Sequence, residues 1–344
     1  MGDLPVEEKT LSGTNKTAAF NTEKLKRDFF IDKLKGAAIF LVVWGHFIQY
    51  SANNDFFHNP VFIVIYSFHM PVFMAISGYL YYLSIQKREF KQLVTIRFKQ
   101  LIIPLLIWSV PLLYLNNHFQ SNTIAPAKWL EMYILHIPDL LWFIWSLFLC
   151  SIILTVVNKF FNDLLWVYFA AIIVINLLPD IYSLQYTKFM LPYFIGGYLV
   201  HKYGLKSNLI TALSFVFFLV MLYYWQLDDY IYVGNMAIHN IHILYTDIYR
   251  YLIGFFGIVV FITIIKWIPK SKPLELAGRY SLGIYILSTF PLHVIHYLNL
   301  KYDIIFFNFL YAPLLSVVII IMCIGINMLI GKNKSLSKYL FGGR

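Results

Sequence analysis

The sequence predicts an all-α integral membrane protein with about ten transmembrane helices and with both termini in the cytoplasm. Only 13% of the 344 residues are charged, whereas 60% are hydrophobic and the mean hydropathy is +0.67. A soluble domain carries about 25% charged residues, so this chain lacks the polar side chains that a water-covered surface needs. Most of its apolar runs are continuous over about 17–25 residues, the length of helix that crosses the hydrocarbon core.

Ten apolar segments mark the expected spans. The sixth is short and contains Pro192 and the pair Gly196-Gly197, which predicts a kinked or half-length helix. In chain order the expected spans are 36–52, 61–83, 101–116, 133–157, 164–179, 188–201, 208–226, 248–268, 281–300 and 304–331.

The basic residues are distributed unevenly over the loops between these spans. With the N-terminus inside, 23 of the 27 lysines and arginines fall on one side of the membrane. The other side carries only Lys128, Lys188, Arg250 and Lys301. This asymmetry follows the positive-inside rule and indicates an even number of spans with both ends cytoplasmic. The net charge of +10 therefore reflects topology and contact with membrane lipid, and it indicates no nucleic-acid partner.

The chain divides into one membrane domain with a short tail at each end. Residues 1–23 are polar, with Phe20 as their single aromatic residue, and we expect disorder there. The expected division is a tail over 1–28, the membrane domain over 29–332 and a cytoplasmic tail over 333–344. No small-residue cleavage site follows the first span, which predicts an uncleaved anchor. Cys150 and Cys323 both fall within spans and are expected to be buried free thiols.

The first span carries an ionisable side chain deep in an apolar segment. In "IDKLKGAAIFLVVWGHF", residues 31–47, ten almost uniformly apolar residues separate Lys35 from His46. A charge at the membrane centre costs roughly 2.5 kcal/mol or more, so such a residue is a functional candidate. On a helix Lys35 and His46 share a face and lie about 16 Å apart along the axis. With Asp32 on nearly the same face, this stripe suits a long anionic molecule that enters from the cytoplasm.

Plainer interpretations of these residues stay open. His46 could serve only as a hydrogen-bonding partner of a neighbouring helix, and Asp32 with Lys35 could be an interfacial ion pair at i,i+3 spacing.

The same residues resemble the start of the membrane acyltransferase 3 family, whose members O-acylate cell-envelope sugars and related acceptors. The family typically begins with Asp, two residues, a basic residue and Gly, followed by an apolar helix that ends in His. Asp32, Lys35, Gly36 and His46 take these places. The form "IDKLKG" is most similar to the branch of fucose or sugar O-acetyltransferases.

Later segments continue the resemblance in the order that the family shows. "SFHMPVFMAISGYL", residues 67–80, resembles its second helix and aligns His69, Ser77 and Tyr79. "RFKQLIIP", residues 97–104, resembles the basic entry to the third span. Supporting matches are "LWFIWSLFL" (141–149), "LPYFIGGYLV" (191–200) and "GRYSLGIYIL" (278–287). The resemblance covers roughly residues 30–300.

Three positions depart from the family pattern. Lys35 stands where Arg is frequent, which replaces a bidentate fork for phosphate with a point charge. The family's Arg-x-x-Arg before the third span reads Arg97 followed by Gln100. The ninth span commonly reads Tyr-x-x-His, but Ser288 occupies the place of that histidine and the nearest one is His293. We assign no role to His293 on this basis.

The resemblance implies an acyltransferase that uses acetyl-CoA or another acyl-CoA as donor and an envelope sugar or polysaccharide as acceptor. His46 is the expected general base, because a neutral imidazole can take the hydroxyl proton. A covalent acyl-histidine relay stays open. Lys35, Arg97 and Lys99 are expected to bind the donor's phosphates, whereas positive-inside topology alone explains the basic cluster at 87–91.

Asp32, His69, Ser77 and Tyr79 are supporting candidates. Ser77 could donate a hydrogen bond to the developing oxyanion. The pair Ser77-Gly78 equally suits close helix packing by small residues. His69 could contact the acceptor or orient the first helix.

Other polar and aromatic features carry weaker expectations. Trp142 and Tyr285 are interpreted as packing or interfacial aromatic residues. The outer loop 227–247 is either an acceptor-facing surface or only solvated. Two histidine pairs have i,i+3 spacing, namely His239 with His242 and His293 with His296. Because no carboxylate or thiol completes a ligand set, no metal is expected.

Two other functions fit parts of the sequence. A glycan or lipid-linked sugar exporter would also use many spans and intramembrane histidines, but no inverted repeat or pair of interrupted helices is present. An inactive relative acting as a partner in glycan synthesis would tolerate the departures at Lys35 and Gln100. The acyltransferase is favoured, in a plasma membrane that the resemblance suggests is bacterial.

Overall fold

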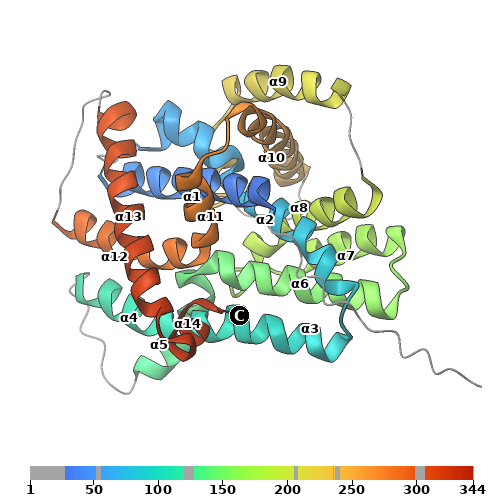
Figure 1. Ribbon diagram of the computed structural model, residues 1–344. Helices are drawn as coiled ribbons and strands as arrows, with labels where there is room; N and C mark the ends of the chain where they lie inside the picture. The colour runs from blue at the N-terminus through green and yellow to red at the C-terminus, as the bar shows by residue number, and fades with distance from the viewer. Residues whose placement is uncertain are drawn as a thin grey trace, which may run out of the picture.

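Every regular element in the described part of the chain is a helix. The computed structural model describes residues 28–51, 56–119, 128–204, 208–234, 236, 241–298 and 307–343. The longer helices in Figure 1 are α1 (Phe29–Ser51), α2 (Pro60–Ile85), α4 (Ile103–Phe119), α6 (Trp142–Phe160), α8 (Leu184–Tyr203), α9 (Asn208–Tyr223), α10 (Ile241–Trp267), α12 (Ser281–Tyr297) and α13 (Ala312–Gly331). The shorter helices are α3 (Phe90–Arg97), α5 (Trp129–Leu140), α7 (Leu165–Leu177), α11 (Lys272–Arg279) and α14 (Lys334–Phe341). Single turns are η1 (Phe56–His58), η2 (Phe98–Ile102), η4 (Leu227–Asp229) and η5 (Phe307–Tyr311). The expected all-α class is confirmed for these residues.

Among the residues that the structure describes, five helical segments are long and apolar enough to cross a membrane. They are Pro60–Ile85, Phe90–Asn117, Trp142–Phe160, Ile241–Trp267 and Asn308–Gly331. The second joins α3, η2 and α4, where η2 is a π-helical turn. The described residues of the ten predicted apolar segments are mainly helical, including those in the shorter α7, α9 and α12, and ten membrane crossings stay a prediction.

Two segments differ in detail from their expected form. The expected span 133–157 is divided at Leu141, whose backbone (φ −130°, ψ 52°) is not helical, so that α5 ends there and α6 begins. Pro138 lies just before this break, and proline removes a helical hydrogen bond. The segment with Pro192, expected to be kinked or half-length, belongs to the continuous 20-residue helix α8.

Helix α1 lies in the interior of the bundle. It packs against α2, α10, α11, α12 and α13, and Ala38, Val43 and Ile48 along it are fully buried. A helix that is apolar on most sides is stable only when other helices or lipid surround it. Because other helices surround α1, its residue His46 lies inside the protein although the surrounding sequence is as apolar as a lipid-facing segment.

Small residues allow the backbones of α2 and α8 to approach closely. A Cβ added at Gly78 would overlap the carbonyl oxygen of Phe194, and one added at Gly197 would overlap that of Ala75. Helix interfaces in membranes use glycine in this way. For Gly78 the structure therefore supports the packing interpretation. The two cysteines, Cys150 and Cys323, are buried free thiols, as expected.

Candidate active site

A cavity of about 410 Å³ lies where α1, α4 and α12 approach their C-terminal ends. Ligand pockets typically measure about 300–1,000 Å³, so this volume suits a small substrate. Helices α2, α5 and α6 and the turn after η4 complete its wall. Its polar and aromatic lining comprises His46, Gln49, Tyr50, Tyr66, Asn116, Asn117, His136, Asp139, Trp142, Tyr232, Tyr285, Thr289 and His293.

Hydrogen bonds fix the protonation of the His46 ring. Its Nδ1 lies 3.0 Å from Gln49 Oε1 and 3.1 Å from the Tyr66 hydroxyl, and that hydroxyl donates to the same Gln49 oxygen over 2.8 Å. An amide oxygen only accepts, so the His46 Nδ1 carries the hydrogen. The Nε2 of neutral His46 then keeps its lone pair, which a general base requires.

Tyr66 connects His46 to the second predicted histidine. The Tyr66 ring lies 4.7 Å from the His69 ring, and the His69 Nδ1–H donates to the carbonyl of Ile65 over 2.7 Å. His69 is buried at 2% exposure, and it is not among the described residues that line the cavity. From this position His69 can pack against Tyr66 and help to hold the first helix, and direct contact with an acceptor is the weaker interpretation.

His293, to which the sequence analysis assigned no role, lines the same cavity as His46. Its Nδ1–H donates to the carbonyl of Thr289 over 2.7 Å, which leaves its Nε2 unprotonated in the neutral ring. The Tyr50 ring lies 5.2 Å from the His293 ring and 6.2 Å from the His46 ring. A pattern in the sequence could have found it, because Tyr285, Thr289 and His293 follow at i, i+4 and i+8 on one helix face.

Trp142 and Tyr285 also lie in the cavity wall, where the sequence indicated packing or interfacial aromatics. Trp142 is the first residue of α6 and directly follows the break at Leu141. This break in the expected span lies beside the cavity that the Trp142 ring lines. Asn116 and Asn117 contribute amides from the last turns of α4. These residues come from three helices that are far apart in sequence, and no local pattern marks them.

The predicted donor-side residues lie apart from the cavity along α1. Asp32 is buried and lies 3.8 Å from the Lys35 ammonium, so the i,i+3 ion pair is present. Lys35 is eleven residues before His46, or about 16 Å along the helix axis. A Cβ added at Gly278 of α11 would overlap the carbonyl oxygen of Asp32, so α11 packs closely against the start of α1.

Arg97 ends α3 and Lys99 lies in the turn η2, so both belong to the apolar segment Phe90–Asn117. The Arg97 guanidinium stacks over the Tyr81 ring at 4.4 Å, and Lys99 is exposed in the π-helical turn η2. A π-helical turn within an α-helix is frequent at functional sites.

Ser77 and Tyr79 lie further along α2, beyond Tyr66 and away from the cavity. Ser77 is eleven residues after Tyr66, which corresponds to about 16 Å of helix. Ser77 is half-buried, and the Tyr79 ring packs 4.1 Å from the ring of His201. Neither residue belongs to the described lining of the cavity.

Within the described ranges no group of three or more histidines, cysteines or carboxylates is close enough to hold a metal ion. His239, one of the paired histidines, lies outside the described residues.

Comparison with known proteins gives a family match and two relatives. The acyltransferase 3 model, described as "Acyltransferase domain", matches residues 28–328. Nodulation protein NolL of Mesorhizobium japonicum is 31% identical over 230 residues, which cover 62% of this chain and 61% of that protein. Nodulation protein NolL of Sinorhizobium fredii is 37% identical over 182 residues, which cover 50% and 48%. The matched part therefore spans only about half to three fifths of these relatives. No solved structure matches the chain.

Proposed function

The chain belongs to the acyltransferase 3 family, and from this premise we propose that it is a membrane O-acyltransferase, most simply an O-acetyltransferase. It would move an acyl group from a cytoplasmic acyl-CoA, foremost acetyl-CoA, to a hydroxyl of a cell-envelope sugar or polysaccharide. The observation that carries this proposal is the placement of His46 in a polar cavity with its Nδ1 already hydrogen-bonded to Gln49.

In the proposed reaction His46 is the general base. Its Nε2 takes the proton of the acceptor hydroxyl while the hydroxyl oxygen attacks the thioester carbonyl carbon. The tetrahedral intermediate then breaks its C–S bond, and the departing thiolate takes the proton back from the imidazolium. The products are the O-acyl ester and free coenzyme A, so protons and electrons balance. Gln49 and Tyr66 orient the ring throughout.

The donor would bind with its phosphates at the cytoplasmic end and its thioester at the cavity. Lys35, Arg97 and Lys99 are the proposed phosphate contacts, with Asp32 orienting Lys35. The extended arm of coenzyme A suits the separation of about 16 Å between Lys35 and His46. Ser77 and Tyr79 are kept as supporting residues along the α2 segment that this arm would pass.

The proposed topology has ten spans with both ends in the cytoplasm of a bacterial cell and the domain over residues 29–332. It rests on the distribution of lysine and arginine. The C-terminal ends of α1, α4 and α12, which carry the cavity, then face outward because the first, third and ninth spans run in the same direction. Acyl transfer would accordingly reach the acceptor at the outer end of the bundle.

The test is acyl-CoA turnover by the purified full-length protein. Wild type should bind coenzyme A and hydrolyse acetyl-CoA slowly, and His46→Ala should lose hydrolysis by about 10²-fold or more while keeping coenzyme A binding. Lys35→Ala should weaken binding instead. Full turnover by His46→Ala would remove His46 as the base. Absence of binding to any acyl-CoA by wild type would favour the exporter.

A further inference from the structure

Three aromatic rings form one wall of the cavity region, called here the aromatic wall: Trp142, Tyr186 and Tyr232. The Trp142 ring centroid lies 4.6 Å from that of Tyr186 and 5.9 Å from that of Tyr232. The Tyr186 and Tyr232 centroids are 5.7 Å apart. Trp142 and Tyr232 line the cavity directly. The three residues come from α6, α8 and the turn after η4, so tertiary structure alone assembles them.

Polar groups border the cavity beside this wall. The amides of Asn116 and Asn117 line it, and the Asn117 Nδ2 is buried without a hydrogen-bond partner among the described residues. Asp139 also lines the cavity, accepts a hydrogen bond from the Ser183 hydroxyl and lies 3.6 Å from His136. Apolar rings next to uncharged and charged hydrogen-bonding groups suit a ligand with one apolar face and a polar rim.

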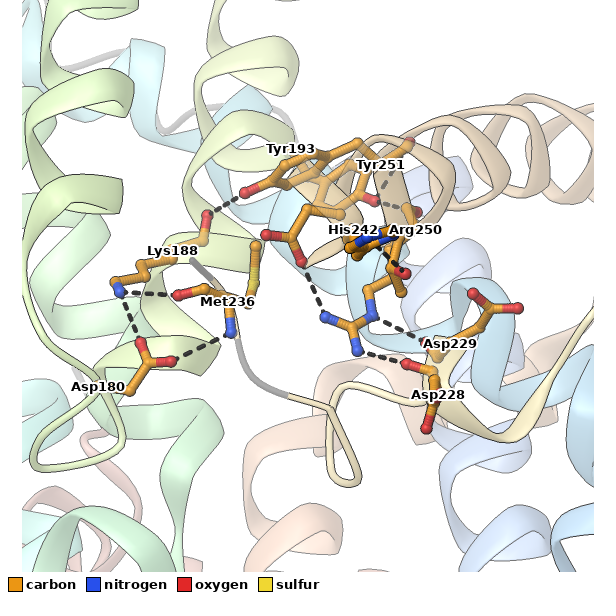
Figure 2. A network of polar contacts seen from close by, with 11 residues as sticks. Asp180, Lys188, Tyr193, Asp228, Asp229, Met236, His242, Arg250 and Tyr251 are labelled. Carbon is orange, nitrogen blue, oxygen red and sulfur yellow. Dashed lines mark hydrogen bonds and ion pairs between the residues drawn. The ribbon is translucent and has the colours of Figure 1, made fainter. Parts of the chain in front are cut away.

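Tyr232 belongs to the segment from Gln226 to Gly234, called here the outer segment, and a buried arginine fixes its start. Figure 2 shows Arg250 of α10 with its guanidinium between the segment and its own helix. The Arg250 Nε donates to the carbonyl of Asp229 over 3.2 Å, and its Nη2 donates to the carbonyl of Asp228. Its Nη1 lies 2.9 Å from the carboxylate of Asp247. Arg250 and Asp247 are each only 1% exposed.

A second buried cation fixes the chain just beyond the outer segment. The Lys188 ammonium of α8 lies 2.6 Å from Asp180 and donates to the carbonyl of Met236 over 3.2 Å. Asp180 in turn accepts from the Met236 amide over 3.1 Å. Within the segment, the Tyr230 hydroxyl donates to the carbonyl of Phe57 over 2.8 Å. Tyr232 therefore lies between two anchored points.

Burial of these two charges makes the position of the segment stable. Lys188 and Arg250 are two of the four cations on the predicted outer side, and both are 1% exposed. A buried charge is tolerated only while its hydrogen-bond partners stay in place. If the outer segment moved away, Arg250 would lose two carbonyl acceptors, and the Asp247 carboxylate of its own helix would not replace them. The outer segment therefore keeps one position, and the ring of Tyr232 is already in place before a ligand binds.

We propose that Trp142 and Tyr232 are the ring-stacking residues of an acceptor subsite that takes a pyranose unit, with Arg250 and Lys188 as positioning residues that hold Tyr232. The C–H face of a pyranose packs on aromatic rings, while its hydroxyls extend to a polar rim of the kind that Asn116, Asn117 and Asp139 supply. The inference rests on the proposed acyl transfer, because it assigns the second substrate of that reaction.

The test uses purified full-length protein, acetyl-CoA and two probe acceptors, methyl fucopyranoside and the open-chain fucitol. Fucitol offers hydroxyls without a flat C–H face. Tyr232→Ala and Trp142→Ala should each raise the acceptor KM for the glycoside by about 2- to 12-fold, the range that an aromatic contact supplies. The KM for acetyl-CoA should change less than the KM for the glycoside, because the proposed phosphate contacts of the donor lie at the other end of α1.

Matched variants distinguish the loss of ring stacking from a general loss of folded, active protein. Tyr232→Phe keeps the ring and should keep the wild-type KM. Tyr223→Ala removes a tyrosine that is 84% exposed on α9, and it should also behave as wild type. Arg250→Lys keeps the charge but has fewer donors, so it should raise the acceptor KM while hydrolysis of acetyl-CoA stays unchanged.

Three results would overturn the subsite. The first is an unchanged acceptor KM in both alanine variants while wild type transfers acetyl groups. The second is an equal preference of wild type for fucitol and the glycoside. The third is hydrolysis of acetyl-CoA by wild type with no transfer to either probe, because the subsite then has no substrate. If wild type did not use acetyl-CoA at all, the result would instead contradict the proposed acyltransferase function.

Discussion

At the scale of single residues, the decisive contact is the one between His46 and Gln49. An imidazole acts as a base only through a nitrogen that carries no hydrogen, and the hydrogen bond at the other nitrogen decides which one that is. Here Gln49 Oε1 accepts at 3.0 Å from the His46 Nδ1 and also accepts from Tyr66. Gln49 is therefore the residue that keeps the His46 Nε2 available.

Replacing Gln49 tests this assignment without touching the base. Gln49→Leu removes the acceptor, so the hydrogen can move to Nε2 and kcat should fall by about 10- to 100-fold with little change in the donor KM. Gln49→Glu keeps an oxygen that accepts from both Nδ1 and Tyr66, and it should retain most of the wild-type kcat. Steady-state hydrolysis of acetyl-CoA measures both variants, and a wild-type kcat in Gln49→Leu would contradict the orienting role.

The sequence predicted one half of this site and missed the other for a physical reason. His46 was recognisable because an ionisable residue in an apolar helix is energetically unfavourable unless it has a function or a partner. Gln49 lies one turn further on the same helix and is polar, but nothing local distinguishes it from a residue at a span end. His293 was missed although it shares a helix face with Tyr285 and Thr289. Asn117 joins the cavity only through packing of α4, which a single sequence does not specify.

At the scale of helices, the contact between α2 and α8 depends on backbone proximity at Gly78 and Gly197. Gly78→Ala would place a methyl group on the Phe194 carbonyl, which belongs to a helix backbone and cannot rotate away. Because α2 also carries Tyr66 and His69, separation of these helices would displace the residues beside His46. Overpacking of this kind destabilises by about 1–3 kcal/mol or more.

Gly78→Ala should therefore lower the melting temperature in detergent and the yield of monodisperse protein. Gly196→Ala is the matched control on α8, since a Cβ added there meets no described heavy atom within 4 Å beyond its own stretch of helix. That control should be neutral or slightly more stable, because alanine favours a helix over glycine by about 1 kcal/mol. Equal melting temperatures for the two variants would show that the close approach is not needed.

The apolar runs of the sequence predicted where the long helices lie, but they did not predict where helices end or where amphipathic helices lie. The described residues of the predicted segments are mainly helical, because long apolar runs in this chain leave few other solutions. The break at Leu141 was hidden inside one such run, and hydropathy does not detect a break that is itself apolar. α11 and α14 are short and carry charges, so a search for spans passes over them, although α11 packs along α1.

At the scale of the whole molecule, the two ends of the bundle have different chemical character. In the predicted topology, Lys35, Arg97 and Lys99 belong to the side with most of the basic residues. The cavity lies near the opposite ends of α1, α4 and α12, and there Lys188 and Arg250 are buried in ion pairs. If the basic end is cytoplasmic, the donor and the acceptor approach from opposite sides of the membrane.

Labelling of single cysteines tests this orientation. Cys150 and Cys323 are buried, so their replacement by alanine gives a background for Lys87→Cys and Glu131→Cys, both exposed positions. In intact cells of a bacterial host, a membrane-impermeant maleimide should label Glu131→Cys, because α5 lies on the cavity side. Lys87→Cys should be labelled only after the membrane is permeabilised, and Lys334→Cys near the C-terminus should behave in the same way. If Lys87→Cys and Glu131→Cys were labelled from the same side of the membrane, the number of crossings between them could not be odd. The cavity would then open on the same side as the donor.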